Sequence, residues 1–217
     1  MRIVRLTAAV AIATAAVGCA TTVDGSATSD GFTPAASNPD PSRSIEGVTV
    51  VDYPPGDHVR TDQRVAYDHT PPFGGPHDAV WATCTGTVYG TPIRNENAVH
   101  SLEHGAVWIT YDPARVSGAD LDLLVARVEG RPYMLLSPYP TLPSAVSVQS
   151  WGHRLQLDDP ADGRIDDFVD ALRLNPNTYP EPGATCSTIP GMFDPSNPPP
   201  LRTDPPDPAS PDTVPMN

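Results

Sequence analysis

The sequence has 217 residues, with 13 arginines, no lysine and 26 acidic residues, and its formal net charge is −13. Without lysine the chain cannot form a lysine Schiff base or use a phosphate-binding loop lysine, and so acidic a chain is a poor partner for nucleic acid. The 28 prolines far exceed the usual share of about 5 %, so we expect part of the chain to lie outside a compact domain.

The first 18 residues resemble a bacterial secretory leader that ends in a lipidation motif. Arg2 and Arg5 precede an apolar stretch that is shorter than the roughly 20 residues of a membrane span, and Ala16-Val17-Gly18-Cys19 resembles a lipobox. We therefore expect a lipoprotein signal peptide over residues 1–18 and export to the outer face of the cell membrane, with lipid anchoring through Cys19. The alternative is an ordinary cleaved signal in which Cys19 is incidental.

The segments that flank the expected domain are rich in polar residues and proline. Residues 19–46 are rich in Ser, Thr, Gly, Pro and Asp, resemble the start of actinobacterial lipoproteins, and are predicted to form a disordered tether. Residues 191–217 are Pro-rich and lack an apolar run from Asp194 on, which predicts a disordered tail. A single domain over residues 47–190 remains between them.

Six stretches of this domain have the pattern of short strands. In chain order they are 48–53, 83–89, 106–111, 133–136, 145–151 and 154–157. The third and fourth are apolar almost throughout, as in strands that are buried on both faces. The last two alternate between apolar and polar residues, so we expect them to be half exposed.

Two helices are marked by caps and by apolar residues at helical spacing. The first is expected to start at Ser117 and end at Gly130, and the second to start at Asp162. Each has one apolar stripe, formed by Leu121, Leu124, Val125 and Val128 in the first and by Ile165, Phe168, Val169 and Leu172 in the second. The order of elements predicts an α+β domain, a mostly antiparallel sheet with two amphipathic helices packed on it.

Two cysteines remain once Cys19 is lipidated. Cys84 and Cys186 allow one pairing, and an exported compartment is oxidising enough to keep a disulfide. The alternative is that both thiols are metal ligands.

A histidine motif precedes the third strand. If residues 99–105 form a helical turn, His100, Glu103 and His104 share a face, where two imidazoles four residues apart can reach one ion. Glu103 would then be a third ligand or an acceptor for an imidazole N–H. Ser101 stands where the zincin motif needs glutamate, which excludes that class of metalloprotease. Spacing alone equally allows one core and one surface histidine.

A Pro- and Gly-rich loop at residues 70–77 ends in His77. Together with the motif at 99–105, Trp151-Gly152 and the acidic helix start at 162–168, it resembles the DUF3105 family of bacterial proteins over about residues 50–182. The resemblance implies that His77, His100, Glu103 and His104 are the motif positions. It implies no activity, because the family is one of unknown function.

We therefore expect an envelope lipoprotein that binds copper or zinc through His77, His100 and His104, with Glu103 supporting, for metal sensing, delivery or sequestration. Met134, as a soft copper ligand, and His153, as a fourth imidazole, are additional candidates, although core packing also explains Met134. We expect His58 and His69 to be solvated.

Two other functions remain open from the sequence. One is a non-catalytic interaction or structural domain whose histidines form a hydrogen-bonded core network. The other is a metal-dependent hydrolase with Glu103 as base. No catalytic residue is assigned, and the sequence names no protein partner.

Overall fold

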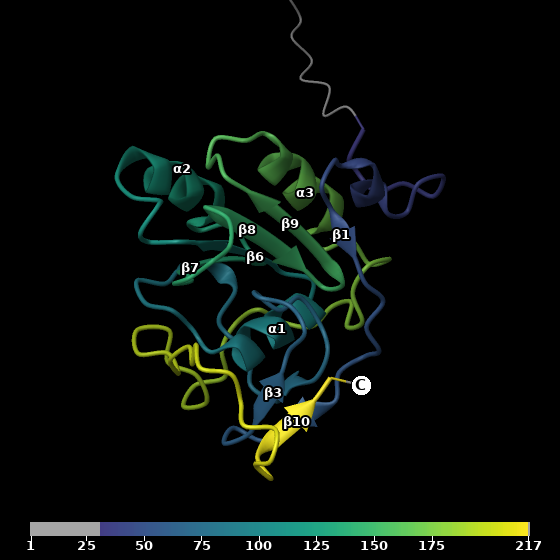
Figure 1. Ribbon diagram of the computed structural model, residues 1–217. Helices are drawn as coiled ribbons and strands as arrows, with labels where there is room; N and C mark the ends of the chain where they lie inside the picture. Colours follow the sequence, from purple (N-terminus) through teal and green to yellow (C-terminus); the bar gives the residue numbers. More distant parts are fainter. Residues whose placement is uncertain (1–30, 217) are drawn as a thin grey trace, which may run out of the picture.

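The computed structural model of the protein describes residues 31–216, and a six-stranded sheet lies at its centre (Figure 1). The strands are arranged in the order β1-β9-β8-β6-β7-β5. Each overlaps a stretch that the sequence predicts as a strand: β1 (Thr49–Val50), β5 (Thr85–Val88), β6 (Val107–Tyr111), β7 (Met134–Pro138), β8 (Val146–Ser150) and β9 (His153–Leu157).

The sheet is mixed, so the expectation of a mostly antiparallel sheet is wrong. β7 runs parallel to both of its neighbours, β6 and β5, whereas β6, β8, β9 and β1 pair antiparallel in turn. The physical reason is the helix between β6 and β7: a helical crossover returns the chain to the same end of the sheet, so that the second strand runs parallel to the first.

The two helices expected from the sequence cover one face of the sheet (Figure 1). They are α2 (Ala119–Val128) and α3 (Arg164–Leu172). Their stripes pack on side chains of the central strands, with Leu124 and Phe168 fully buried. Ser117 does not cap α2, because the helix starts one residue later, after Gly118, which has φ +56°.

A third helix, α1 (Asn95–Glu103), carries the histidine motif and packs on the opposite face of the sheet (Figure 1). Ala98 and Leu102 lie in a second apolar cluster with Trp108 of β6 and Leu135 of β7. Neighbouring residues of β6 and β7 belong to the first cluster, so both strands are buried on both faces, as expected. Gly105, with φ +87°, follows the end of α1.

The strand β8 is more buried than its alternating pattern suggests. All five of its residues are buried, including Ser147 and Gln149, whose side chains hydrogen bond to each other. The expectation of a half-exposed strand is therefore wrong for β8, because helices lie on both of its faces. β9 does alternate between buried and partly exposed positions.

The packed part of the chain extends beyond the expected boundaries at residues 47 and 190. Ile45, after the 3₁₀ helix η1 (Pro41–Ser44), lies in the first apolar cluster, and Phe193 lies in the second. Strand β10 (Thr213–Pro215) pairs with β3 (Arg64–Ala66). Single apolar side chains and the pairing of β10 with β3 attach these segments to the domain, whereas a disordered tether and tail are expected there from the sequence.

Several expectations for the N-terminus concern residues outside the described part of the chain. The proposed signal peptide, Cys19 and the tether up to residue 30 are among them. Within residues 31–216, no helix is long and apolar enough to cross a membrane.

Two features connect segments that are far apart in the sequence. The expected disulfide between Cys84 and Cys186 is confirmed and spans 102 positions. The short strands β2 (His58–Val59) and β4 (His77–Asp78) pair in parallel, with His58 opposite His77.

Candidate metal centre

The Pro- and Gly-rich loop delivers His77 into the interior. Its side chain is fully buried, and ring atom Nδ1 lies 2.9 Å from the carbonyl oxygen of Gly75. A carbonyl only accepts hydrogen bonds, so Nδ1 carries the proton and a neutral His77 ring has its lone pair on Nε2.

The helix α1 places His100, Glu103 and His104 beside this ring. The Nδ1 atoms of His100 and His104 also face backbone carbonyls, those of Asp78 at 2.6 Å and Thr185 at 2.8 Å. The same reasoning puts the Nδ1 proton on both rings. A neutral ring therefore keeps its lone pair on Nε2, and His100 lies within reach of the ligand atoms of both His77 and His104.

The Nε2 atoms of His100 and His104 lie only 2.9 Å apart. Burial lowers the pKa of His100 to about 3, and its hydrogen bond to Asp78 does not offset that effect. Burial also lowers the pKa of His104, although Thr185 and the Glu181 carboxylate oppose the shift. At neutral pH, then, two lone pairs face each other, a repulsive contact that a shared cation would relieve.

The separation of these two nitrogens suits ligands of one ion. Zinc–imidazole bonds of about 2.0–2.1 Å place two ligand atoms about 2.9 Å apart when the bonds meet at a right angle, and about 3.3 Å apart in a tetrahedron. The observed distance therefore requires little movement of either ring.

Glu103 brings a negative charge to the same region. Its Oε1 accepts a hydrogen bond of 2.7 Å from the N–H of Gly56, and its Oε2 lies 2.7 Å from Nε2 of His77. The latter contact is not aligned as a hydrogen bond, and His77 Nε2 has no hydrogen-bond partner among the described residues. Such a buried, unpartnered atom requires an explanation.

The ionisation of Glu103 reflects two opposing effects. Burial raises the pKa of this carboxyl, but the His77 ring and the Gly56 N–H outweigh burial and hold the pKa below its usual value. A carboxylate and neutral imidazoles are the forms that bind metal ions.

His58 joins the cluster, and the expectation that it is solvated is incomplete. The parallel pairing of β2 with β4 sets it beside His77, and its ring stacks on that of His100 with centroids 5.0 Å apart. His58 is exposed at its outer side. It belongs to a group of four residues whose ligand atoms, one from each residue, all lie within 4.8 Å of one another: His58, His77, His100 and Glu103.

A second group overlaps the first and includes Glu181, which the sequence analysis did not identify. Ligand atoms of His100, His104 and Glu181 also lie within 4.8 Å of one another. Glu181 is half exposed, and its Oε2 lies 3.3 Å from Nε2 of His104. Its backbone N–H donates to the carbonyl of Glu103, which fixes this segment against the end of α1.

The two additional candidates lie outside both groups. Met134 packs in the first apolar cluster, on the face of the sheet covered by α2 and α3. Both ring nitrogens of His153 already have hydrogen-bond partners. Nδ1 lies 2.6 Å from the carbonyl oxygen of Trp151, and Nε2 lies 3.2 Å from the carboxylate of Asp40. His69 stacks on Phe73 at the loop.

Two tryptophans border the cluster. The ring centroid of Trp81 lies 4.8 Å from that of His104 and 5.4 Å from that of His100. The Trp151 centroid lies 5.8 Å from that of His77. Aromatic walls of this kind reduce the access of water and provide a fluorescence signal for events at the histidines.

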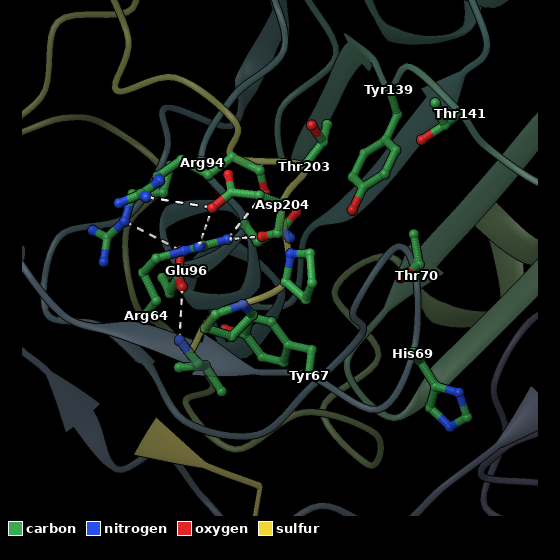
Figure 2. Close-up of a pocket in the computed structure, with 15 residues that line it drawn as sticks. Arg64, Tyr67, His69, Thr70, Arg94, Glu96, Tyr139, Thr141, Thr203 and Asp204 are labelled. Carbon is green, nitrogen blue, oxygen red and sulfur yellow. Dashed lines mark hydrogen bonds and ion pairs between the residues drawn. The ribbon is translucent and has the colours of Figure 1, made fainter. Parts of the chain in front are cut away.

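A separate cavity of about 220 Å³ lies at the start of α1, under the segment 202–206 (Figure 2). Arg64 lies 3.0 Å from Asp204, and Arg94 contacts Glu96 (Figure 2). Arg94 also pairs with Asp78, which does not line the cavity. Because these guanidinium groups are already paired with carboxylates, the cavity offers little excess charge to an ionic ligand. Its lining does not include the clustered histidines or Glu103.

Comparisons with known proteins identify a family but no activity. The chain matches the family described as "Protein of unknown function (DUF3105)" over residues 58–188, which is more than half of its length. No curated protein and no solved structure matches the chain.

Proposed function

The chain belongs to the DUF3105 family, and we propose that it binds one divalent metal ion within the cluster of His77, His100, His104 and the carboxylate of Glu103, in which His100 belongs to both groups of possible ligands. The observation that carries this proposal is the contact of 2.9 Å between Nε2 of His100 and His104, two neutral rings whose protons are held at Nδ1. The unpartnered Nε2 of His77 beside Glu103 supports it.

The ligand types favour Zn²⁺ or Cu²⁺. Imidazole nitrogens suit both ions, and a carboxylate adds a hard oxygen ligand. Cu⁺ prefers soft sulfur ligands, but the thioether of Met134 is on the other side of the sheet and both Cys84 and Cys186 are consumed in the disulfide.

We further propose that the protein works outside the cell membrane, anchored through lipid on Cys19, in metal sensing, delivery or sequestration. The disulfide supports an oxidising compartment. The net charge of −13 favours the approach of cations. Replacement of Cys19 by alanine is expected to release the protein from membranes, as measured by cell fractionation. A Cys19→Ala protein that stays membrane-bound would contradict the anchor.

The metal-binding proposal is tested by calorimetric titration of metal-stripped protein with Zn²⁺ and Cu²⁺, followed by elemental analysis. We expect one ion per chain and a dissociation constant in the micromolar range or below. The variants His77→Ala and His100→Ala should each bind at least about tenfold more weakly, because each removes a ligand from the group that contains Glu103. His69→Ala is the matched control, since this ring lies outside the cluster.

Two outcomes would contradict the proposal. A well-folded protein with no affinity for either ion, and with a thermal midpoint that neither chelator nor added metal changes, would favour a purely structural histidine network. Equal affinity in wild type and in both cluster variants would place the bound ion elsewhere.

A further inference from the structure

The two ligand groups overlap in a single residue, His100. From this overlap we infer that one ion moves between two positions: an outer one held by His100, His104 and Glu181, and an inner one held by His58, His77, His100 and Glu103. The inference rests on the proposed function and adds to it a route and a direction of transfer.

Exposure decreases from Glu181 through His104 to His77, whereas the ring of His58 in the inner group is exposed. The Glu181 side chain is 48 % exposed, that of His104 only 3 %, and that of His77 not at all. A hydrated cation can therefore meet the Glu181 carboxylate first. The Glu103 carboxylate, whose side chain is 3 % exposed, belongs to the inner group.

The chemistry of His100 restricts the two positions to one ion at a time. Its Nδ1 proton is donated to the carbonyl of Asp78, so the neutral ring has one lone pair, on Nε2. Bridging two ions would require loss of that proton and of its buried hydrogen bond. Two separately ligated ions would therefore compete for the same nitrogen.

In the transfer step, each ligand that leaves the ion is replaced by a ligand of the same chemical type. The ion keeps its bond to His100 Nε2 while its bonds to His104 and Glu181 break and bonds to His77 and Glu103 form. One imidazole and one carboxylate leave as one imidazole and one carboxylate bind, so the charge of the complex is unchanged. The inner position adds the ring of His58, and we therefore expect the ion to occupy it at equilibrium.

The test compares the rates of metal binding with its equilibrium. Stripped full-length protein is mixed with Cu²⁺ in a stopped-flow instrument, where quenching of Trp81 and Trp151 reports the ion beside the histidines. Dissociation is followed by mixing the loaded protein with excess chelator. The variant is Glu181→Gln, and Glu129→Gln is the matched control, since it removes one exposed negative charge at the end of α2.

We expect Glu181→Gln to slow association and dissociation by a similar factor of about ten, which is within the range of electrostatic effects on binding rates. The dissociation constant should change little, because Glu181 is not a ligand at the inner position. Glu129→Gln should match the wild type in both rates, and the wild type should bind one Cu²⁺.

The inference and the proposed function fail in different ways. Unchanged rates in Glu181→Gln would show that the ion enters elsewhere, for example past the exposed ring of His58, and would overturn the route. A weaker equilibrium affinity with unchanged association, or two ions per chain, would overturn the shared single ion. A wild type that binds no Cu²⁺ would overturn metal binding itself.

Discussion

At the scale of single residues, backbone carbonyls decide what the histidines can do. Gly75, Asp78 and Thr185 each accept the Nδ1 proton of one clustered ring. Fixing the tautomer in this way leaves Nε2 free in all three cases, as outer contacts do for histidines that ligate metals. The proposed cation would therefore meet histidine rings that are already oriented.

The lowered pKa of His100 predicts how the stability of the metal-free protein depends on pH. Its folded pKa is about 3, against an ordinary value of 6.5, so as pH falls below 6.5 the unfolded chain binds a proton that the folded protein does not. Stability should be fully present above pH 6.5 and decline towards pH 3, with a contribution from His100 of at most about 1.4 kcal/mol per pH unit. His104 shifts in the same direction.

Urea unfolding of stripped protein at several pH values between 7 and 4 measures this dependence. His100→Asn, which keeps a donor for the Asp78 carbonyl but does not titrate, should show a shallower decline than the wild type. Parallel curves for the two proteins would mean that the pKa of His100 does not differ between the folded and unfolded states.

Sequence patterns identified most residues of the candidate cluster but not their surroundings. The i, i+3, i+4 spacing of His100, Glu103 and His104 predicts their common face, because a helix fixes that geometry locally. His58 and Glu181 escaped detection, since each reaches the cluster through contacts made far away along the chain. A pattern within a few residues carries no information on such contacts.

At the scale of elements, the segment that precedes β2 passes close to α1. No space is left beside Gly56 in this segment. A Cβ atom at this position would overlap the His77 ring and lie 2.8 Å from Oε1 of Glu103. The Gly56 N–H must also reach that oxygen. This glycine is therefore required by the closeness of the backbone to two proposed ligands.

Gly56→Ala should weaken metal binding by at least about tenfold, because the added methyl group displaces His77 and Glu103 from one another. The measurement is calorimetric titration with Zn²⁺, and circular dichroism verifies folding. Gly90→Ala is the matched control, since a Cβ there meets no atom within 4 Å. Equal affinity in both variants would show that His77 and Glu103 do not act together on the ion.

The disulfide connects Cys186, in the segment whose Thr185 carbonyl contacts His104, to Cys84, directly before β5. Thr185, whose carbonyl orients His104, directly precedes Cys186. In the chain-entropy model a closed loop of about 100 residues contributes roughly 4.7 kcal/mol to the free energy of unfolding, and measured values are usually smaller. The bond therefore supports the fold and the segment that contains the proposed outer ligand Glu181.

The double variant Cys84→Ser/Cys186→Ser should lower the free energy of unfolding by about 2–4 kcal/mol, as measured by urea denaturation. Its rate of Cu²⁺ association should also fall, since Glu181 and Thr185 lose their anchor. Reducing agent should have the same effects on the wild type and none on the variant. A variant as stable as the wild type would show that packing alone holds this segment.

At the scale of the whole molecule, the sheet separates a layer of two apolar-packed helices from the layer that contains the candidate site. α2 and α3 cover one face with apolar side chains, and their positions follow from regular stripes that the sequence displays. The other face carries α1, the loop that ends in His77 and the segments around residues 56 and 181. Irregular segments dominate there, so its arrangement could not be predicted from periodicity.

The same distinction explains the errors at the level of topology. Strand positions follow from local apolar patterns. The direction in which two strands pair depends instead on the path of the chain between them, and this path makes β7 parallel to both of its neighbours. Single apolar residues such as Ile45 and Phe193 give no periodic signal, although each lies in an apolar cluster.

The most direct test of metal binding is a crystal structure of the protein loaded with Zn²⁺, with diffraction recorded on both sides of the zinc absorption edge. We predict one anomalous peak per chain within bonding distance of Nε2 of His77 and His100, with Glu103 as the oxygen ligand. An anomalous peak confined to surface carboxylates, or none at all in a crystal grown with excess zinc, would contradict the account.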